Sequence, residues 1–252
     1  MELNEHVAVI TGSSMGIGRA VAEHFLREGA RVVVNSHRAG VAEEVAQELG
    51  PADHVLGVHA DVSTPEGAAT LVATAMNQFG RLDIMVANAG TSLIRSAEDI
   101  TPDEWEAVVR LNLSGVFYSA QAAARAMIPA HRGSIVLMGS ILGRMGLPRR
   151  AAYAATKHAL VGLGKVLAVD WAPHGIRVNV LAPGYIATPM NVRDLSTTDY
   201  TDADIARRDP LGRYGTVDEI AEAALFLASD RSTYVSGIDL PVDGAWLAYG
   251  GW

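Results

Sequence analysis

The amino-acid sequence predicts an α/β protein built on one doubly wound sheet of about seven mostly parallel strands, with helices on both faces. Short apolar runs alternate with longer segments of helical periodicity about six times, which is the pattern of parallel strands joined by crossover helices. No internal repeat, linker or low-complexity tract interrupts the 252 residues. We therefore expect residues 1–252 to form a single domain.

The expected strands are mostly short apolar runs, as in strands that are buried on both faces. The third is less apolar and ends at Asp61 and Val62. Pro241, in the last run, has no N–H to donate, which favours an edge position in the sheet. The runs cover residues 7–10, 31–34, 55–62, 84–87, 135–138, 177–181 and 238–242.

The expected helices begin at recognisable cap residues. Thr64 precedes a proline, and Thr101 and Thr216 each stand three residues before a glutamate, which is the pattern of a capping box. Residues 113–127 carry almost only small or apolar side chains, so we expect that helix to be buried in the core or against another subunit. The helices are expected over residues 17–28, 41–49, 65–79, 102–112, 113–127, 151–169 and 217–227.

Residues 185–211 show little periodicity and carry mixed charges, including Arg193, Asp194, Arg207 and Arg208. A long irregular segment inside a compact domain is usually either functional or poorly ordered. We interpret this segment as a lid over the substrate. The alternative is a solvated excursion on the surface.

The composition argues against several classes of protein. A formal charge of -8 with few clustered basic residues disfavours a nucleic-acid-binding surface. There is no cysteine for disulfides or thiolate metal sites, and we expect no metal site. No apolar stretch is long enough to span a bilayer, and residues 1–5 lack the features of a signal peptide. We expect a cytoplasmic protein without membrane or nucleic-acid partners.

A glycine cluster follows the first strand directly. Residues 11–18 have the form Thr-Gly-x-x-x-Gly-x-Gly, with Gly12, Gly16 and Gly18 between the strand and the next helix. Backbone N–H groups at the start of a helix attract an anion, and glycines let a pyrophosphate approach without a Cβ in the way. This context indicates a dinucleotide-binding sheet of the Rossmann type. The alternative is a glycine-rich connection without a ligand.

The end of the second strand bears on which dinucleotide is bound. Dinucleotide sites usually carry an acid there for the ribose hydroxyls, but Asn35, Ser36, His37 and Arg38 include none. A carboxylate would repel a 2′-phosphate, whereas Ser36, His37 and Arg38 can hold one. We therefore expect NADP to be preferred over NAD. The alternative is that Arg38 is a solvated loop cation.

Tyr153 and Lys157 stand four residues apart in a long Ala- and Leu-rich helical run, so they lie on the same face of the helix. A phenol with its ordinary pKa of about 10 is a poor base at neutral pH. A lysine ammonium nearby favours the phenolate, lowers the pKa of the tyrosine and makes its oxygen a usable proton shuttle. Taken alone, the spacing also fits a surface pair with no function.

Polar and glycine-rich residues follow most of the expected strands. The carboxyl ends of parallel strands meet at one rim of the sheet, where ligands bind in such folds. Independent motifs that converge on one rim are stronger evidence for a site than any one of them. These positions are residues 11–12, 35–38, 61–62, 88–90, Ser140 and residues 183–184.

Together the motifs resemble the short-chain dehydrogenase/reductase family, classical type, over essentially the whole length. The resemblance implies an NAD(P)-dependent oxidoreductase that interconverts an alcohol and a ketone or aldehyde. The motifs are specific for the family and poorly specific for the substrate. They comprise residues 11–18, 61–62, 88–90, Asn112, Ser140, Tyr153, Lys157, residues 183–184 with Thr188, and residues 242–244.

The resemblance implies a role for each of four catalytic residues. Tyr153 would be the general acid in reduction and the base in oxidation, and Lys157 would lower its pKa and bind the nicotinamide ribose. Ser140 would hydrogen-bond the substrate oxygen where charge develops. Asn112 would hold a water in a proton relay to Lys157. The alternatives are an ordinary strand-end serine and a helical polar residue.

The resemblance also implies the cofactor contacts. Asp61 and Val62 would lie beside the adenine, Asn88 along the cofactor, and Ile186 and Thr188 at the carboxamide. Asp61 could instead cap the next turn, and Asn88 could serve backbone hydrogen bonds in the sheet. The expected cofactor set is completed by Gly12, Ser14, Met15, Gly16, Ile17, Gly18, Arg38, Tyr153 and Lys157.

The resemblance leaves the substrate open. We expect a sugar, a polyol or another small secondary alcohol, and a 3-oxoacyl-thioester (acyl-carrier-protein) reductase is the alternative. A non-catalytic dinucleotide-binding sensor is the alternative from another class, against which the intact Ser140, Tyr153 and Lys157 argue. Met15 stands where many NADP-preferring relatives carry a basic residue, so Arg38 is the main argument for NADP.

Family members usually form tetramers, so the resemblance implies a homotetramer. The apolar helices over residues 113–127 and 153–169 are where subunits would pack. The stretch over residues 244–252 is apolar and aromatic and includes Trp246 and Trp252. We expect it to pack at a subunit interface, and the alternative is burial in its own subunit.

Overall fold

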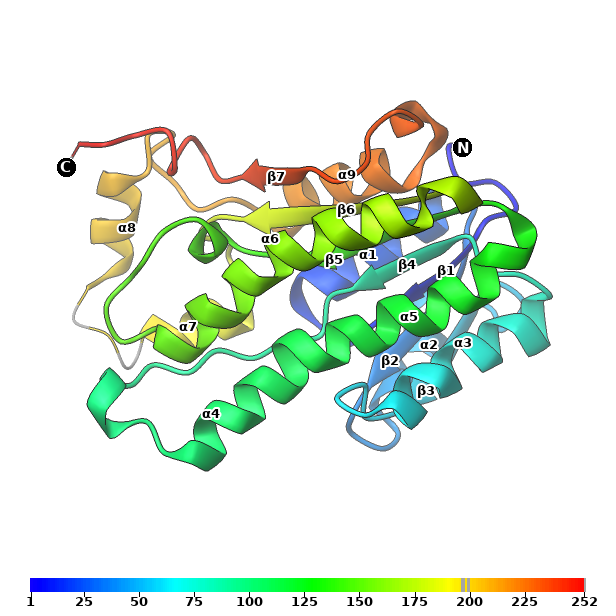
Figure 1. Ribbon diagram of the computed structural model, residues 1–252, viewed down its shortest axis with the longest axis horizontal. Helices are drawn as coiled ribbons and strands as arrows, with labels where there is room; N and C mark the ends of the chain where they lie inside the picture. The colour runs from blue at the N-terminus through cyan, green and yellow to red at the C-terminus, as the bar shows by residue number, and fades with distance from the viewer. Residues whose placement is uncertain (196–197, 199, 252) are drawn as a thin grey trace.

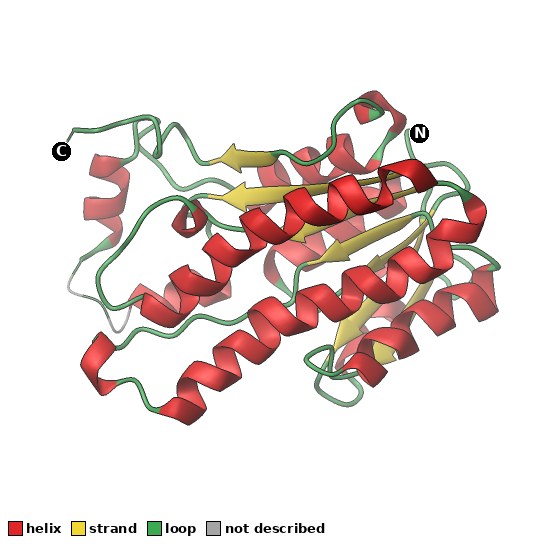
Figure 2. Cartoon of the chain, viewed as in Figure 1, coloured by secondary structure: helices red, strands yellow, loops and turns green. Residues whose placement is uncertain are grey.

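The computed structural model describes residues 1–195, 198 and 200–251, and in them seven strands form one sheet. The strand order is β3-β2-β1-β4-β5-β6-β7, and each of these neighbouring pairs is parallel. The predicted doubly wound α/β fold is therefore confirmed (Figure 1 and Figure 2). The strands are β1 (Val7–Ile10), β2 (Arg31–Ser36), β3 (Val55–His59), β4 (Ile84–Ala87), β5 (Gly133–Met138), β6 (Ile176–Pro183) and β7 (Asp239–Val242).

The strand order reverses direction at β1, whose neighbours are β2 on one side and β4 on the other. In open sheets of this kind the crevice for a ligand opens outside the carboxyl ends of the strands at this switch point. Both the glycine loop after β1 and the segment after β4 start here. Pro241 lies in β7 at the edge of the sheet, as predicted.

Helices cover both faces of the sheet (Figure 1). The layer on one face holds α1 (Gly16–Arg27), α2 (Val41–Leu49) and α9 (Val217–Ala228), and the layer on the other holds α3 (Pro65–Phe79), α5 (Val116–Met127) and α6 (Ala151–Trp171). Phe25 of α1 is fully buried in one core cluster together with Ile10. Leu160 of α6 is fully buried in the second cluster with Leu137. The sheet is therefore covered by apolar side chains on both faces, which explains its unbroken apolar strands.

The predicted helix caps are present. The hydroxyl of Thr64 accepts a hydrogen bond from the Gly67 N–H at 3.1 Å, and Pro65 follows at the first helical position. Thr101 and Thr216 each make both hydrogen bonds of a capping box. These caps fix where α3, α4 (Pro102–Val109) and α9 begin.

The run from α4 to α5 is one long helical rod with a π-helical turn, Arg110–Gly115, in the middle. The sequence predicts two helices that meet after Asn112, and it does not predict the π turn. A π turn inserts one extra residue into the helical repeat and often marks a functional site. It leaves Asn112 fully buried and brings Gly115 to the loop after β3, where a Cβ would lie 2.7 Å from the Val62 carbonyl oxygen.

Some boundaries differ from the prediction. β3 ends at His59, so Asp61 and Val62 lie in the loop after it. Residues 185–211 are not irregular throughout, because they contain α7 (Pro189–Leu195) and α8 (Asp202–Arg208). The two short helices lie beyond the carboxyl ends of the strands (Figure 1). Residues 196, 197 and 199 of this segment lie outside the described residues.

Short 3₁₀ turns complete the connections. They are Ala97–Asp99, Ile128–Ala130, Ile141–Gly143, Ala172–His174 and Asp230–Ser232. Within the described residues, no helix combines the length and the apolar character that a membrane span needs.

Candidate active site

Ser140 and Tyr153 meet at the carboxyl end of β5. Ser140 stands two residues after this strand, and Tyr153 lies in the first turn of α6. Their side chains line the same pocket, and the Ser140 hydroxyl is close enough to the phenol to lower its pKa. The Ser140 hydroxyl also accepts a hydrogen bond from the Leu142 N–H at 3.1 Å, so it caps the 3₁₀ turn after β5 as well. The backbone thus holds the serine in place beside the phenol.

Lys157 follows one turn later and is almost completely buried. Its ammonium donates a hydrogen bond to the Met138 carbonyl oxygen at 2.6 Å and lies 5.5 Å from the centre of the Tyr153 ring. Burial lowers the pKa of Lys157 to about 8, because the charged form loses its hydration. This lysine therefore changes its charge close to neutral pH.

The pKa of Tyr153 moves in the opposite direction from the sequence expectation. Burial raises it, and this effect exceeds the lowering by the Ser140 hydrogen bond and by the Arg150 charge. Lys157 is not among the groups that lower the pKa of Tyr153, and its ammonium donates a hydrogen bond to the Met138 carbonyl oxygen. In this arrangement the phenol keeps its proton at neutral pH.

Asn112 has a clear structural task. Its carboxamide donates a hydrogen bond to the Thr91 carbonyl oxygen at 2.7 Å and accepts one from the Thr91 N–H at 2.9 Å. These bonds tie the π turn to the segment after β4. The Asn112 side chain is engaged in holding this segment, so a water relay through this residue would use its main-chain carbonyl group.

The glycine loop fits a pyrophosphate. Gly12 and Gly16 have φ angles of +60° and +57°, in the left-handed region that favours glycine. A Cβ on Gly18 would lie 2.5 Å from the Asn88 side-chain nitrogen. The start of α1 has no side-chain cap and no acidic residue in its first turn, so its N–H groups and helix dipole are available to an anion.

Asn88, directly after β4, is hydrogen-bonded to the glycine loop. Its side-chain nitrogen donates hydrogen bonds to the carbonyl oxygens of Thr11 and Gly12, at 2.9 and 3.0 Å. The Thr11 hydroxyl in turn accepts from the N–H groups of Asn88 and Ala89. The alternative interpretation, in which Asn88 serves backbone hydrogen bonds, describes what the structure shows.

Asn35 is a supporting residue whose role the sequence analysis missed. It is buried, and its side-chain oxygen accepts a hydrogen bond from the Gly12 N–H at 3.1 Å. Its side-chain nitrogen donates to the carbonyl oxygens of Val58 and Ala60, at 3.2 and 3.1 Å. The side chain thus joins the glycine loop to the end of β3. A carboxamide in place of the usual acid after β2 was the available signal.

The remaining loop residues lie along the same rim. The Asp61 carboxylate is exposed and accepts from the Ser63 N–H at 2.9 Å, as in the alternative interpretation of a turn cap. Val62 is buried. Arg38 is exposed, and its N–H donates to the Ser36 hydroxyl at 3.1 Å. The two loops are joined, because the Ala60 N–H donates to the Ser36 carbonyl oxygen.

Ile186 and Thr188 lie at the start of residues 185–211, the segment that is expected to form a lid and is named the lid on that expectation. Ile186 is buried and forms an isolated parallel bridge with Gly215. The Thr188 hydroxyl accepts from the Asn191 N–H at 3.3 Å at the start of α7. A Cβ on Gly16 would lie 3.9 Å from the Thr188 Cβ. The first residues of the lid therefore sit directly against the glycine loop, as a carboxamide contact would need.

Ser140 and Tyr153 line a small pocket between the end of β5 and residues 184–194. Its lining combines apolar side chains with polar and charged ones, so the pocket suits a small molecule with several polar groups. The lining residues are Ser92, Ser140, Ile141, Leu142, Leu147, Arg150, Tyr153, Gly184, Tyr185, Met190, Asn191 and Asp194.

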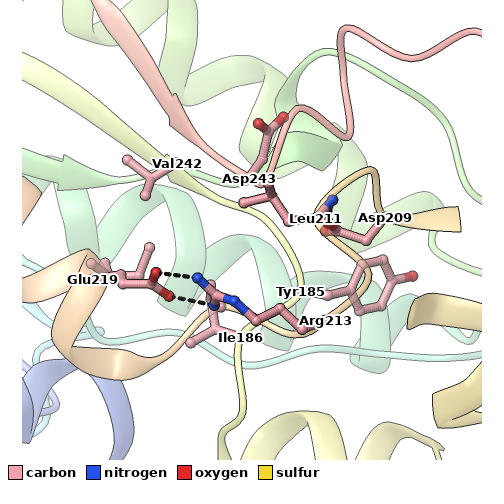
Figure 3. A pocket seen from close by; sticks show the side chains of 11 residues that line it. Tyr185, Ile186, Asp209, Leu211, Arg213, Glu219, Val242 and Asp243 are labelled. Carbon is pink, nitrogen blue, oxygen red and sulfur yellow. Dashed lines mark hydrogen bonds and ion pairs between the residues drawn. The ribbon is translucent and has the colours of Figure 1, made fainter. Parts of the chain in front are cut away.

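A second hollow lies on the other side of Tyr185 (Figure 3). Arg213 and Glu219 form an ion pair there, with nitrogen–oxygen distances of 2.9 and 2.6 Å. Asp209 and Asp243 border the same hollow. Figure 3 shows this ion pair among the residues that line the hollow, and neither Ser140 nor Tyr153 lines it.

The expectation that the C-terminal tryptophans pack at a subunit interface is wrong for Trp246. The Trp246 residue is only 4% exposed within its own chain. The centre of its ring lies 4.8 Å from the centre of the Tyr185 ring and 4.3 Å from the Arg208 guanidinium carbon. Trp246 therefore packs against Tyr185 and Arg208 of the segment over residues 185–211. Trp252 lies outside the described residues. Within the described residues, no group of three or more metal-ligating side chains comes together.

The family model described as enoyl-(acyl carrier protein) reductase matches residues 12–246, which is nearly the whole chain. With the parallel sheet and the site at its rim, this match shows that the chain belongs to the short-chain dehydrogenase/reductase family. The protein is an NAD(P)-dependent oxidoreductase that acts on CH–OH groups.

Individual relatives span several substrates. The 3-oxoacyl-(acyl-carrier-protein) reductase FabG of Salmonella typhimurium is 38% identical, over 97% of this chain and 98% of its own length. The NAD-dependent glycerol dehydrogenase of Listeria innocua is 35% identical, over 97% and 94%. A solved structure from Beutenbergia cavernae, a candidate NAD(P)-dependent gluconate 5-dehydrogenase with NADP bound at low occupancy, has a TM-score of 0.91. It is 39% identical and covers 98% of this chain and 99% of its own.

We predict that Asn35→Asp destabilises the protein and weakens dinucleotide binding. An aspartate has no N–H for the carbonyl oxygens of Val58 and Ala60 and places a charge among them. The loss is about 1–3 kcal/mol in the free energy of unfolding. The measurements are thermal unfolding and NADPH titration by fluorescence. Asn77→Asp, the same change on the exposed face of α3, is the control and should leave both values unchanged. Equal values for Asn35→Asp and the wild type would contradict the supporting role.

Proposed function

We propose that the protein interconverts a sugar, a polyol or another small secondary alcohol and its carbonyl compound, with Tyr153 as general acid and base. The observation that supports this most is that Ser140 and Tyr153 line one small pocket together with the polar side chains of Ser92, Arg150, Asn191 and Asp194. Such a pocket offers hydrogen bonds to a substrate that carries several hydroxyl groups.

Ser140 and Tyr153 would both bind the reacting oxygen of the substrate, and Tyr153 alone would exchange a proton with it. Both hydroxyls would donate hydrogen bonds to the carbonyl oxygen, where negative charge develops during reduction. Tyr153 would then supply the proton, and in oxidation it would remove one. Tyr153 would enter the reduction with its proton, because burial raises its pKa, and Ser140 and the Arg150 charge would bring that pKa closer to the range in which a phenol donates readily.

Lys157 and Asn112 would serve proton transfer behind Tyr153. Lys157, with its pKa lowered to about 8, can pass a proton near neutral pH. To contact the nicotinamide ribose, the Lys157 ammonium would give up its hydrogen bond to the Met138 carbonyl oxygen. Asn112 would hold a water through its main-chain carbonyl group, since its carboxamide is bonded to Thr91.

The rim of the sheet would hold the dinucleotide, whose nicotinamide ring gives or takes the hydride when it is bound. Asp61 and Val62 would contact the adenine, Asn88 would lie along the cofactor, and Ile186 with Thr188 would orient the carboxamide. Arg38 would meet a 2′-phosphate. The glycine loop would bind the pyrophosphate through Gly12, Ser14, Met15, Gly16, Ile17 and Gly18.

We propose NADP as the preferred cofactor. Arg38 and His37 are exposed at the end of β2, beside the Ser36 hydroxyl, and no acidic residue stands among residues 35–38. The Beutenbergia cavernae structure has NADP bound, whereas the Listeria innocua relative is NAD-dependent, so the residues of this chain carry the argument.

A 3-oxoacyl-thioester reductase is the second candidate, because FabG is 38% identical over nearly the whole chain. A long acyl chain needs an apolar wall, whereas this pocket is lined in part by the charged side chains of Arg150 and Asp194.

A non-catalytic dinucleotide sensor is the third candidate. The presence of Ser140 and Tyr153 in one pocket, with Lys157 one turn away, favours an enzyme.

We further propose a homotetramer in the cytoplasm. Val166 and Val169 on α6 are 57% and 74% exposed, and Trp105 on α4 is 39% exposed. Large apolar side chains on the outer face of two helices fit packing against other subunits. A cytoplasmic location follows from the proposed use of NADP(H), which cells keep in their interior.

We predict that Tyr153→Phe lowers kcat by at least about 100-fold, because the phenol is the proton donor and acceptor. Binding of NADPH and the melting temperature should change little, since the ring is retained. The measurement is the change in NADPH absorbance with a panel of polyols, sugars and their ketones. Tyr234→Phe, at a fully exposed tyrosine, is the control. Full activity of Tyr153→Phe would disprove the assigned role.

We predict that Arg38→Ala raises the KM for NADPH by about 10- to 100-fold and leaves that for NADH unchanged. A guanidinium bound to a phosphate makes charge-assisted hydrogen bonds that NADH cannot make. The measurement is steady-state kinetics with both cofactors. Arg27→Ala, at an exposed arginine in the last turn of α1, is the control. Equal turnover of the wild type with both cofactors would contradict the preference.

A further inference from the structure

A buried ion pair forms part of the lining of the pocket that contains Ser140 and Tyr153. Arg150, the residue before α6, donates a hydrogen bond from Nη1 to Oδ2 of Asp194 in α7 at 2.9 Å. Arg150 is 6% exposed and Asp194 is 8% exposed. Both residues line the pocket that holds Ser140 and Tyr153.

The pair belongs to a wider hydrogen-bond network. The Ser92 hydroxyl donates to Oδ1 of Asp194 at 2.7 Å, and Nη2 of Arg150 donates to the Tyr200 hydroxyl at 3.1 Å. Arg193 also contacts Asp194, at 3.2 Å, but its side chain is 58% exposed and so keeps its hydration. The network joins the segment after β4, the start of α6 and the lid, so its geometry is fixed from three sides.

A pair of this kind is poorly explained by stability alone. Burial of two charges removes their hydration, and well-packed apolar side chains of similar size are often at least as stabilising. The location is more informative. Arg150 lies one helical turn before Tyr153, so its donors stand beside the group that handles the reacting oxygen.

The chemistry of the pair selects among substrates. A guanidinium only donates hydrogen bonds and a carboxylate only accepts them, whereas each hydroxyl of a polyol does both. Side by side, the two groups suit hydroxyls next to the reacting carbon. The Asp194 charge repels a second carboxylate, and an acyl chain would leave both polar groups without new partners.

We propose that Arg150 and Asp194 form the specificity subsite for the hydroxyl groups of an uncharged polyol or sugar, with Asp194 as acceptor and Arg150 as donor. The inference rests on the proposed function and deepens it, because it names the residues that read the substrate. Since Asp194 is carried by α7, the substrate hydroxyls would also bind to the lid.

The test compares a four- or five-carbon polyol with a small secondary alcohol that has a single hydroxyl. In Asp194→Asn and Arg150→Met, the ratio of kcat/KM for the polyol to kcat/KM for the single-hydroxyl alcohol should fall about 10- to 100-fold, since hydrogen bonds to charged groups are lost. Both residues also influence the pKa of Tyr153, but this effect acts on the two alcohols alike, so the ratio isolates the subsite. NADPH affinity should be retained in both variants.

Two further variants separate the subsite from folding. Arg150→Met with Asp194→Leu removes both charges, so it leaves no unpaired buried charge and should fold while losing the polyol preference. Arg207→Met, at an arginine of α8 whose side chain is 77% exposed, is the matched control and should behave as the wild type.

Other outcomes would overturn the inference. Equal losses for both alcohols in every variant would assign the network a structural role only. A preference for a sugar acid that disappears in Arg150→Met alone would make Arg150 a carboxylate site instead. If the wild type itself reduced a 3-oxoacyl thioester and oxidised no polyol, the proposed function would fail before any variant was compared.

Discussion

The contact between the carboxyl end of β5 and the first two turns of α6 determines the chemistry of this protein. It buries Lys157 almost completely and leaves Tyr153 half-buried at the wall of the pocket. Burial disfavours the charged form of each, so it raises the pKa of the phenol and lowers that of the amine to about 8. Both pKa values thus move in the direction that favours the neutral form, although the Lys157 ammonium persists below about pH 8 and donates a hydrogen bond to the Met138 carbonyl oxygen.

The rest of the fold serves this contact by bringing other loops to the same rim. Parallel strands end on one side, so the loops after β1, β2 and β4 lie beside the end of β5 without any long-range signal in the sequence. Three asparagines then hold these loops together. Asn35 and Asn88 fix the glycine loop from two sides, and Asn112 fixes the segment after β4.

Much of the fold could be predicted because local patterns specify it. Apolar runs identify the strands, and threonine caps identify several helix starts. The spacing of the glycines identifies the loop after β1, where Gly12 and Gly16 have left-handed φ angles in the structure. The sequence did not predict the short helices α7 and α8, because seven residues make too few helical turns to show an apolar periodicity. The capping box of Thr201 and Asp204 was the available signal.

The site was predictable in its membership and less so in its physics. The spacing of Tyr153 and Lys157 gives their shared helix face, but it cannot give their burial, which reverses the expected pKa shift of the phenol. The Arg150–Asp194 pair joins residues 44 positions apart, and its partners depend on how the lid folds over the rim. The burial of Trp246 within its own chain also depends on how the segment over residues 185–211 folds, because its neighbours in the cluster include Tyr185 and Ile205.

The central claim is that burial sets the protonation of the catalytic pair. The most direct measurement is the pH dependence of kcat/KM for carbonyl reduction, which reports groups of the free enzyme. The Lys157 ammonium is present below its pKa of about 8 and lost above it, whereas the phenol keeps its proton through this range. Activity that needs this ammonium should therefore fall above about pH 8, and Lys157→Arg, which keeps its charge, should move the fall to higher pH. A flat profile between pH 7 and pH 10 in the wild type, or an identical fall in Lys157→Arg, would contradict the account.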